Sequence, residues 1–138
     1  MIKVETSDIE ILKTLNAGDI VSISGTIYTA RDAAHKKIFA LMKDNMPLPF
    51  PLRNSFVYYT GATPAKDGEP YGSCGPTTSK RMDVYTPDML DAGLKGIIGK
   101  GARTRAVIDA IKRNGAVYFV AIGGAGAFYK SAIKSAEV

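Results

Sequence analysis

The sequence predicts an α/β fold with mixed or parallel strand pairing, because strand-like and helix-like segments alternate from about Ile20 onward. Apolar residues between Ala30 and Lys43 recur at three- and four-residue steps, which is the spacing of one helix face. Ala116–Ile122, by contrast, is a short continuous apolar run of the kind that forms a strand buried on both sides. A chain of 138 residues suits one domain with one core, so we expect a single domain over residues 1–138.

The first part of the chain is predicted to hold two strands, a helical turn and a longer helix. β-Branched residues favour the second strand, Ser7 is a good N-cap for the helical turn, and a cluster of prolines ends the helix. The predicted segments are the strand Met1–Glu5, the helical turn Ser7–Leu15, the strand Ile20–Thr26 and the helix Ala30–Lys43, which Pro47, Pro49 and Pro51 follow.

The rest of the chain is predicted to alternate between short strands and short helices around one long loop. Residues 61–76 are dense in Gly, Pro and polar residues, and loops of this length are often functional. Thr86 is the expected N-cap of one helix, and Val107, Ile108 and Ile111 form the expected inward face of another. The predicted strands are Phe56–Tyr59, Lys95–Gly99 and Ala116–Ile122, and the predicted helices are Thr77–Arg81, Thr86–Gly93, Ala102–Arg113 and Ala127–Ser135.

Composition and charge exclude several classes of protein. The longest apolar run, Ala116–Ile122, is far shorter than the roughly 20 residues that a membrane-spanning helix needs. The single cysteine, Cys74, excludes a disulfide framework and cannot by itself hold a zinc ion or an iron–sulfur cluster. The net charge of +5 allows an anionic partner, but the basic residues are scattered, so a small anion fits the pattern about as well as nucleic acid does.

Two clusters combine backbone amides with cationic side chains at expected turns. In Gly75–Arg81, hydroxyl side chains accompany the guanidinium of Arg81, which can bind a carboxylate through two parallel hydrogen bonds. An ordinary helix N-terminus with surface charges explains this pattern equally well. In Gly99–Lys100–Gly101, glycine on both sides lets a ligand approach the lysine. A plain strand-to-helix turn is the slightly better explanation, because the full phosphate-loop spacing is absent.

A third cluster, Thr26–His35, places Arg31 and His35 on one helix face with Asp32 in the first turn. The simpler explanation is a favourable first-turn charge and a half-buried histidine. Gly123–Gly126 lacks the spacing of a dinucleotide-binding loop, so a turn that packs helix against strand is the better interpretation. Cys74 has no histidine near it in the sequence, and we interpret it as a loop residue rather than a nucleophile.

Three cations, Arg31, Arg81 and Lys100, each adjoin an expected strand end or glycine turn. In open α/β sheets such junctions meet at one edge, where ligands bind. Two or three cations together with hydroxyl groups suit a small di-acid, since each carboxylate can be bound by its own cation. The sequence offers no strong Lewis acid and no obvious carboxylate base, so a partner would have to supply them.

Three motifs occur in a specific order: Gly25-Thr26 with Arg31–His35, Gly75–Ser79 with Arg81–Asp83, and Ile98–Gly101. Together they resemble the β subunit, or C-terminal domain, of class I iron–sulfur fumarate hydratases and of the related L-tartrate dehydratases. The resemblance extends from about Gly18 to the C-terminus. It implies a three-layer β/β/α swivelling domain with a mixed sheet. It also implies a cytoplasmic hydro-lyase of the tricarboxylic acid cycle, which adds water reversibly to fumarate and gives (S)-malate.

The resemblance also implies roles for individual residues and for a partner. The implied substrate-binding residues are Arg31, Thr77, Arg81 and Lys100, of which the last three are also the implied catalytic residues. Thr77 would be the acid/base hydroxyl at the reacting carbon, and Asp32 and His35 would support Arg31. In this family three cysteines of an α subunit hold a [4Fe–4S] cluster. The resemblance therefore implies that partner, no metal ligand in this chain, and an oligomer of heterodimers.

Two other functions stay open on the sequence. The same cations would serve L-tartrate or another 2-hydroxy di-acid, so the sequence does not choose strongly between fumarate and tartrate. A non-enzymatic module for small anions or nucleic acid is the third hypothesis, motivated by the net charge of +5. It is the weakest, because the charge is scattered and aromatic residues near the basic residues are few. We expect no nucleic-acid partner and no membrane partner.

Overall fold

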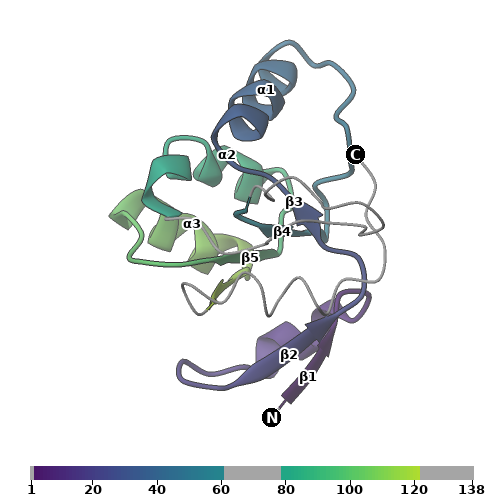
Figure 1. The fold of residues 1–138 in the computed structure, drawn as a ribbon, viewed down its shortest axis with the longest axis vertical. Coiled ribbons are helices and arrows are strands. Elements are labelled where there is room, and N and C mark those ends of the chain that lie inside the picture. Colours follow the sequence, from purple (N-terminus) through teal and green to yellow (C-terminus); the bar gives the residue numbers. More distant parts are fainter. Residues whose placement is uncertain (1, 61–78, 122–138) are drawn as a thin grey trace, which may run out of the picture.

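The computed structural model describes residues 2–60 and 79–121, which form two parallel sheets with helices beside them (Figure 1). In the small sheet, β1 (Ile2–Glu5) pairs with β2 (Val21–Ser24). The larger sheet has the order β3-β4-β5-β6, and its strands are β3 (Tyr28–Thr29), β4 (Phe56–Tyr58), β5 (Gly96–Gly99) and β6 (Val117–Val120). The predicted α/β class is confirmed. Every pairing among these strands is parallel, so the antiparallel pair expected of a mixed sheet does not occur within the described ranges.

Helical segments connect the strands. The described ones are η1 (Ile9–Thr14), α1 (Asp32–Lys43), η2 (Ser79–Met82), α2 (Thr86–Asp91) and α3 (Arg105–Asn114), where η1 and η2 are 3-10 helices. Gly115 ends α3 with φ at +62°, in the left-handed region that glycine adopts without strain. Outside the two gaps of the described chain, no helix has the length and apolar character needed to cross a bilayer.

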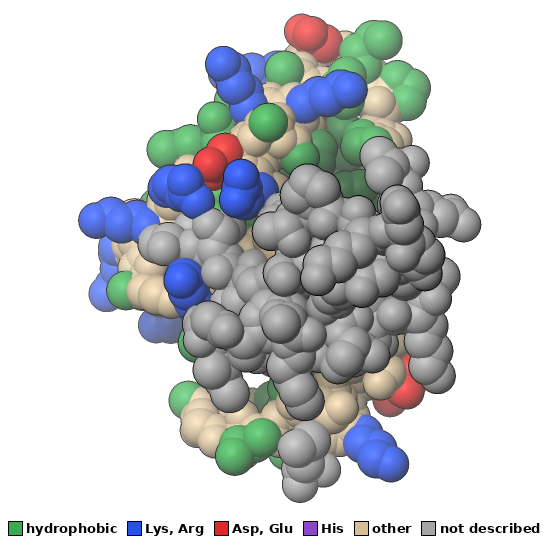
Figure 2. Space-filling model, in the orientation of Figure 1, with side chains coloured by type: hydrophobic (Ala, Val, Ile, Leu, Met, Phe, Trp, Pro, Cys, Tyr) green, Lys and Arg blue, Asp and Glu red, His purple; other side chains and the backbone are tan. Residues whose placement is uncertain are grey.

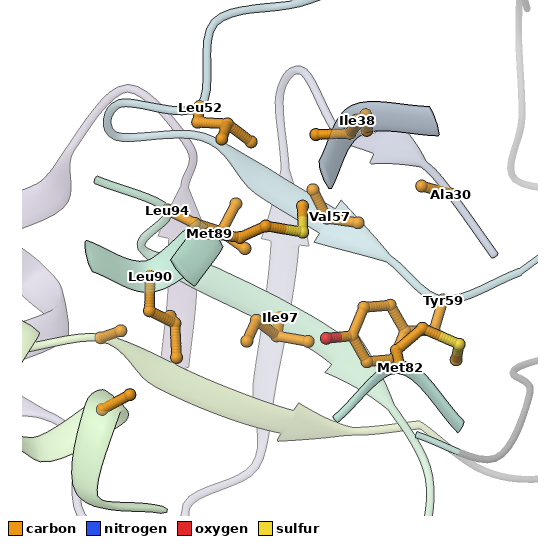
Figure 3. Close-up of a cluster of buried hydrophobic side chains, with 12 residues drawn as sticks. Ala30, Ile38, Leu52, Val57, Tyr59, Met82, Met89, Leu90, Leu94 and Ile97 are labelled. Atoms are coloured by element: carbon orange, nitrogen blue, oxygen red, sulfur yellow. The ribbon is translucent and has the colours of Figure 1, made fainter. Parts of the chain in front are cut away.

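The larger sheet lies between two hydrophobic cores, because successive side chains of a strand point to opposite faces. On one face, Val57 and Ile97 pack against buried residues of α1, α2 and α3 (Figure 3). On the other face, Phe56 packs with side chains of η1 and of the small sheet, including Val4. The small sheet therefore covers one face and the helices cover the other. The swivelling character that the resemblance implies stays a prediction.

Two apolar residues are more exposed than the sequence predicts. The buried face of α3 is formed by Val107 and Ala110, whereas Ile108 is 37% exposed. Ala110 lies about one helical turn beyond Val107 and belongs to the core on the helix face of the sheet. Val120 is 70% exposed, so Ala116–Ile122 is not a run buried on both sides. The reason is that β6 is the last strand of its sheet in the described part of the chain.

The starts of two helical segments also differ from the prediction. Asp8, rather than Ser7, takes the N-cap position of η1. Thr86 was the expected N-cap of α2, but Tyr85 holds that position and Thr86 is already helical. The hydroxyl of Thr86 is buried and donates to the carbonyl oxygen of Met82 at 2.8 Å. The Thr86 hydroxyl therefore bonds a buried carbonyl oxygen instead of capping the helix, as the sequence indicated it would.

The parallel order brings the carboxyl ends of neighbouring strands to one edge of the larger sheet. β3 leads through the buried Ala30 to Arg31, and β5 leads directly into Lys100. β4 lies between these two strands and ends just before the buried Tyr59. Two of the three predicted cations therefore leave the sheet at the same edge, one on each side of β4.

Candidate active site

Arg31 is the N-cap residue of α1 and has an extended backbone, with φ −132° and ψ −159°. Its carbonyl oxygen accepts the backbone N–H of His35 at 2.9 Å and lies 2.8 Å from Nδ1 of the same histidine. His35 is buried, and its ring meets the Tyr59 ring edge-on at 5.0 Å between centroids. Burial lowers the pKa of His35, so the ring is neutral at pH 7 and Nδ1 donates to Arg31. The contact fixes the backbone of Arg31 and leaves its side chain exposed.

Arg81 forms an ion pair with Asp32 across the start of α1. Nη1 of Arg81 lies 3.2 Å from Oδ2 of Asp32, and the two side chains are 55% and 47% exposed. The neighbouring Met82 is fully buried in the core on the helix face, which holds η2 beside α1. We expected Asp32 to support Arg31, so its pairing with Arg81 is a contact that no sequence spacing indicated. The ion pair places Arg81 next to the start of α1, where Arg31 is the N-cap residue.

Lys100 lies in the turn after β5, and η2 is bonded to that turn. The backbone N–H of Ser79 donates to the carbonyl oxygen of Lys100 at 3.0 Å. The Ser79 hydroxyl lies 2.8 Å from the Tyr118 hydroxyl, which in turn donates to the carbonyl oxygen of Gly101 at 2.9 Å. A Cβ on Gly99 would lie only 2.2 Å from Oγ of Ser79, so this close approach requires glycine. The close neighbours of Gly99 are the side chains of Ser79 and Tyr59, and the approach of a ligand to Lys100 stays a prediction.

A buried ion pair between Arg103 and Asp83 lies beneath these segments. Nε of Arg103 donates to Oδ1 of Asp83 at 2.8 Å, and the two side chains are 2% and 5% exposed. Nη2 of Arg103 lies 3.1 Å from both the Tyr59 hydroxyl and the Thr86 hydroxyl. Sequence reasoning missed Arg103 altogether. The available signal was Asp83, which closes the second motif and is an acid that needs a cation when buried.

Aromatic rings enclose the Arg103 guanidinium. Its central carbon lies 4.8 Å from the centroid of the Tyr118 ring and 5.2 Å from that of Tyr59. Burial raises the pKa of both phenols, so both hydroxyls stay protonated at neutral pH. Contacts of a cation with aromatic faces strengthen when water is excluded. The guanidinium is therefore held in one orientation by its acid, by two hydroxyl groups and by two rings.

Cationic side chains gather on one side of the molecular face shown in Figure 2, with an acidic side chain among them. Three of the predicted features lie outside the described residues: the hydroxyl group of Thr77, the loop residue Cys74 and the segment Gly123–Gly126. Within residues 2–60 and 79–121, no group of three or more His, Cys, Asp or Glu side chains is placed to bind a metal ion. The whole sequence contains one cysteine, which does not fit the thiolate ligand set of an iron–sulfur cluster.

Comparison with known proteins assigns the chain to a family. It matches the sequence model of the family described as "Fumarase C-terminus" over residues 1–138. It is 36% identical over 129 residues to "Putative L(+)-tartrate dehydratase subunit beta" of Methanocaldococcus jannaschii, covering 91% of this chain and 66% of that protein. It is 40% identical over 119 residues to "Fumarate hydratase 2" of Leishmania major, covering 85% of this chain and 21% of the relative.

A third relative is "Fumarate hydratase class I, aerobic" of Escherichia coli K12, 39% identical over 120 residues that cover 85% of this chain and 22% of the relative. The chain thus spans just under two thirds of the tartrate dehydratase subunit and about a fifth of these two fumarate hydratases. These matches confirm the resemblance drawn from the three motifs. With its parallel sheet and the cation-bearing turns at one edge, the chain belongs to the fumarase C-terminus family.

Proposed function

We propose that this chain is the β-type part of a hydro-lyase that adds water reversibly to fumarate and gives (S)-malate. The observation that supports it most is the placement of the three cations. Arg31 and Lys100 follow the ends of β3 and β5 at one sheet edge, on either side of β4, and η2, which carries Arg81, is bonded to both of their segments. Loops at the carboxyl edge of a parallel sheet are where such folds bind ligands.

In this proposal the cations bind the two carboxylates of the substrate. Arg81 offers a planar fork that matches a carboxylate, and Lys100 offers a point charge on a flexible stem. Removal of a proton next to a carboxylate leaves a dianionic aci-carboxylate, and fixed cations stabilise the added charge as it develops. Thr77 is the proposed acid/base hydroxyl. An alcohol needs an activating base, and we assign that base to the partner.

The proposal assigns the remaining machinery to another polypeptide. An α subunit, or an N-terminal domain, holds the [4Fe–4S] cluster, and this chain supplies no ligand to it. Its own part is to bind, orient and stabilise the di-acid, and we expect the chain alone to be inactive. The single domain over residues 1–138, the oligomer of heterodimers, the cytoplasmic location and the role in the tricarboxylic acid cycle are further parts of this proposal.

L-Tartrate is the second candidate substrate, because the relative from M. jannaschii is named for tartrate. Both substrates are small di-acids, so the same cations would serve either one. The ratio of kcat/KM for fumarate and L-tartrate, measured on one preparation of the complex, decides between them. Equal or better turnover of tartrate would replace fumarate with tartrate in the proposal.

The test is to assemble the chain with its cognate cluster-carrying subunit under anaerobic conditions, with iron and sulfide, and to follow fumarate and malate. Arg81→Met and Lys100→Met are each expected to lower kcat/KM by at least about 100-fold, the usual cost of removing one group that stabilises developing charge. Thr77→Val is expected to do the same. Arg113→Met is the matched control, since Arg113 is a half-exposed arginine of α3 that pairs with Asp91 of α2. Full activity in the site variants would contradict the residue assignment.

A further inference from the structure

Arg103 is not one of the cations that we assign to the substrate. Its buried guanidinium has hydrogen-bond partners on three other residues. Nε bonds Oδ1 of Asp83, and the backbone N–H of Thr104 donates to Oδ2 of the same carboxylate at 2.8 Å. Both oxygens of Asp83 are thereby occupied by the segment 103–104. Nη2 of Arg103 adds the hydroxyls of Tyr59 and Thr86, which lie 2.9 Å from each other.

The members of this cluster come from the segments that carry the proposed substrate cations. Asp83 lies two residues after Arg81 at the end of η2, and Arg103 lies three residues after Lys100 in the same turn. The ion pair therefore joins the Arg81 segment to the Lys100 segment from beneath. A second link, from the Ser79 N–H to the Lys100 carbonyl oxygen, joins the same two segments one helical turn earlier.

A buried ion pair is costly unless its geometry is good and most of its polar atoms are bonded; in the described part of the chain, Nη1 is the one guanidinium nitrogen of Arg103 without a hydrogen bond. Removing both charges from water carries a large desolvation penalty, which their attraction offsets only with good geometry. Here Nε of Arg103 bonds the carboxylate of Asp83 while Nη2 reaches the hydroxyls of Tyr59 and Thr86, so the planar guanidinium fixes direction as well as distance.

We propose that Arg103 and Asp83 are positioning residues, which form a clasp that sets the distance and orientation of Arg81 relative to Lys100. The clasp touches no substrate and acts through these two cations. This inference rests on the proposed function, because it assigns to the two cations the two carboxylates of one di-acid. A misplacement of about 1 Å in such a pair is enough to cost on the order of 100-fold in rate.

The test compares two conservative variants in the assembled complex. Arg103→Lys keeps the charge but loses the fork, and Asp83→Asn keeps the shape but loses the charge. Each is expected to lower kcat/KM by roughly 100-fold while the complex stays assembled. The matched controls are Arg113→Lys and Asp91→Asn, which alter an ion pair of the same residue types that is about half exposed. The controls are expected to keep wild-type kinetics.

A double-mutant cycle separates positioning from general weakening of the fold. If Arg103 acts through Arg81, Arg103→Lys should cost at least about tenfold less in an Arg81→Met background than in the wild-type complex. An equal loss in both backgrounds would overturn the inference, as would wild-type kinetics in Arg103→Lys and Asp83→Asn. If one of these two variants does not fold, the other carries the comparison.

A second readout needs no substrate. Amide hydrogen exchange of the segments 79–82 and 99–104 is expected to be faster in Arg103→Lys than in the wild type, and unchanged in Arg113→Lys. Unchanged exchange in both variants would overturn the clasp even if the enzyme is active. Conversely, a wild-type complex that turns over neither fumarate nor tartrate would contradict the proposed function. The exchange experiment would then still decide whether the clasp holds the two segments.

Discussion

Asp32 and Arg81 face each other across the start of α1, with 3.2 Å between carboxylate oxygen and guanidinium nitrogen. Asp32 also lies in the first turn of α1, where a negative charge is favourable. The ion pair is half exposed, and pairs of this kind contribute about 0–1 kcal/mol to stability. Its main effect on function is therefore electrostatic, because a carboxylate beside Arg81 competes with an incoming anion for the same cation.

Asp32→Asn is expected to lower KM for the di-acid by up to about fivefold. The substitution removes a negative charge close to the proposed binding site, and the interaction of two unit charges 4 Å apart in water is about 1 kcal/mol. Steady-state kinetics of the assembled complex measure the change. The effect should fade as salt is added, since screening acts on exposed charges. A KM that rises and does not depend on salt would show that Asp32 instead holds Arg81 in place.

Gly99→Ala is expected to destabilise the chain by about 1–3 kcal/mol, the usual cost of forcing an extra carbon into a packed site. The new Cβ would lie 2.2 Å from Oγ of Ser79 and 3.0 Å from the Tyr59 ring, so the Ser79 hydroxyl must leave its position beside Tyr118 or η2 must move. Urea-induced unfolding measures the loss. Ser79→Ala in the same chain removes the clashing oxygen, and the double variant should lose less than the sum of the two single losses. Strict additivity would contradict the steric cause.

Acid should destabilise the fold through His35. Its pKa is lowered below the usual 6.5 by burial, so the unfolded chain takes up a proton in a pH range in which the folded ring stays neutral. The free energy of unfolding is therefore expected to be highest above pH 6.5 and to fall as the pH drops below that value. Denaturant unfolding at several pH values measures the slope. His35→Gln should flatten it just below pH 6.5, since the chain has no other histidine.

Two arginine–aspartate pairs of the chain should differ sharply in their effect on stability. Arg103→Met leaves Asp83 buried without its cation, and breaking such a pair usually costs about 3–5 kcal/mol. Arg113→Met exposes Asp91 to water that already surrounds it, so the midpoint of unfolding should stay close to that of the wild type. Thermal or urea unfolding of the two variants side by side provides the comparison. Similar losses in both would contradict the burial argument.

Local sequence patterns predicted most of the regular elements. Helix periodicity located α1 and α3, and glycine with β-branched neighbours located β5. β3 was not predicted, because it is only two residues long and is defined by its pairing with β4. Thr86 was misassigned as a cap, because a buried acceptor on η2 satisfies its hydroxyl. Patterns within a segment do not show what that segment will meet in the folded chain.

The same limit applies to the candidate site. The three motifs located the turns that carry Arg31 and Lys100, and the structure places those turns at one sheet edge. The partner of Asp32 and the ion pair of Arg103 are both tertiary contacts between segments far apart in the sequence. No periodicity or spacing rule connects such residues. Burial of an acid is the physical reason for the Arg103 contact, and burial becomes visible only once the strands and helices are assembled.

The two separate cores have a consequence for how this family can diversify. The layer made of β1, η1 and β2 meets the larger sheet through apolar side chains, with Val4 and Leu12 fully in the core. The segments next to the cations pack into the other core instead, because Ile38 of α1 and Met82 of η2 are buried there. We therefore expect that a redesigned N-terminal layer of matching volume would pack onto the sheet and leave the geometry of the charged edge unchanged.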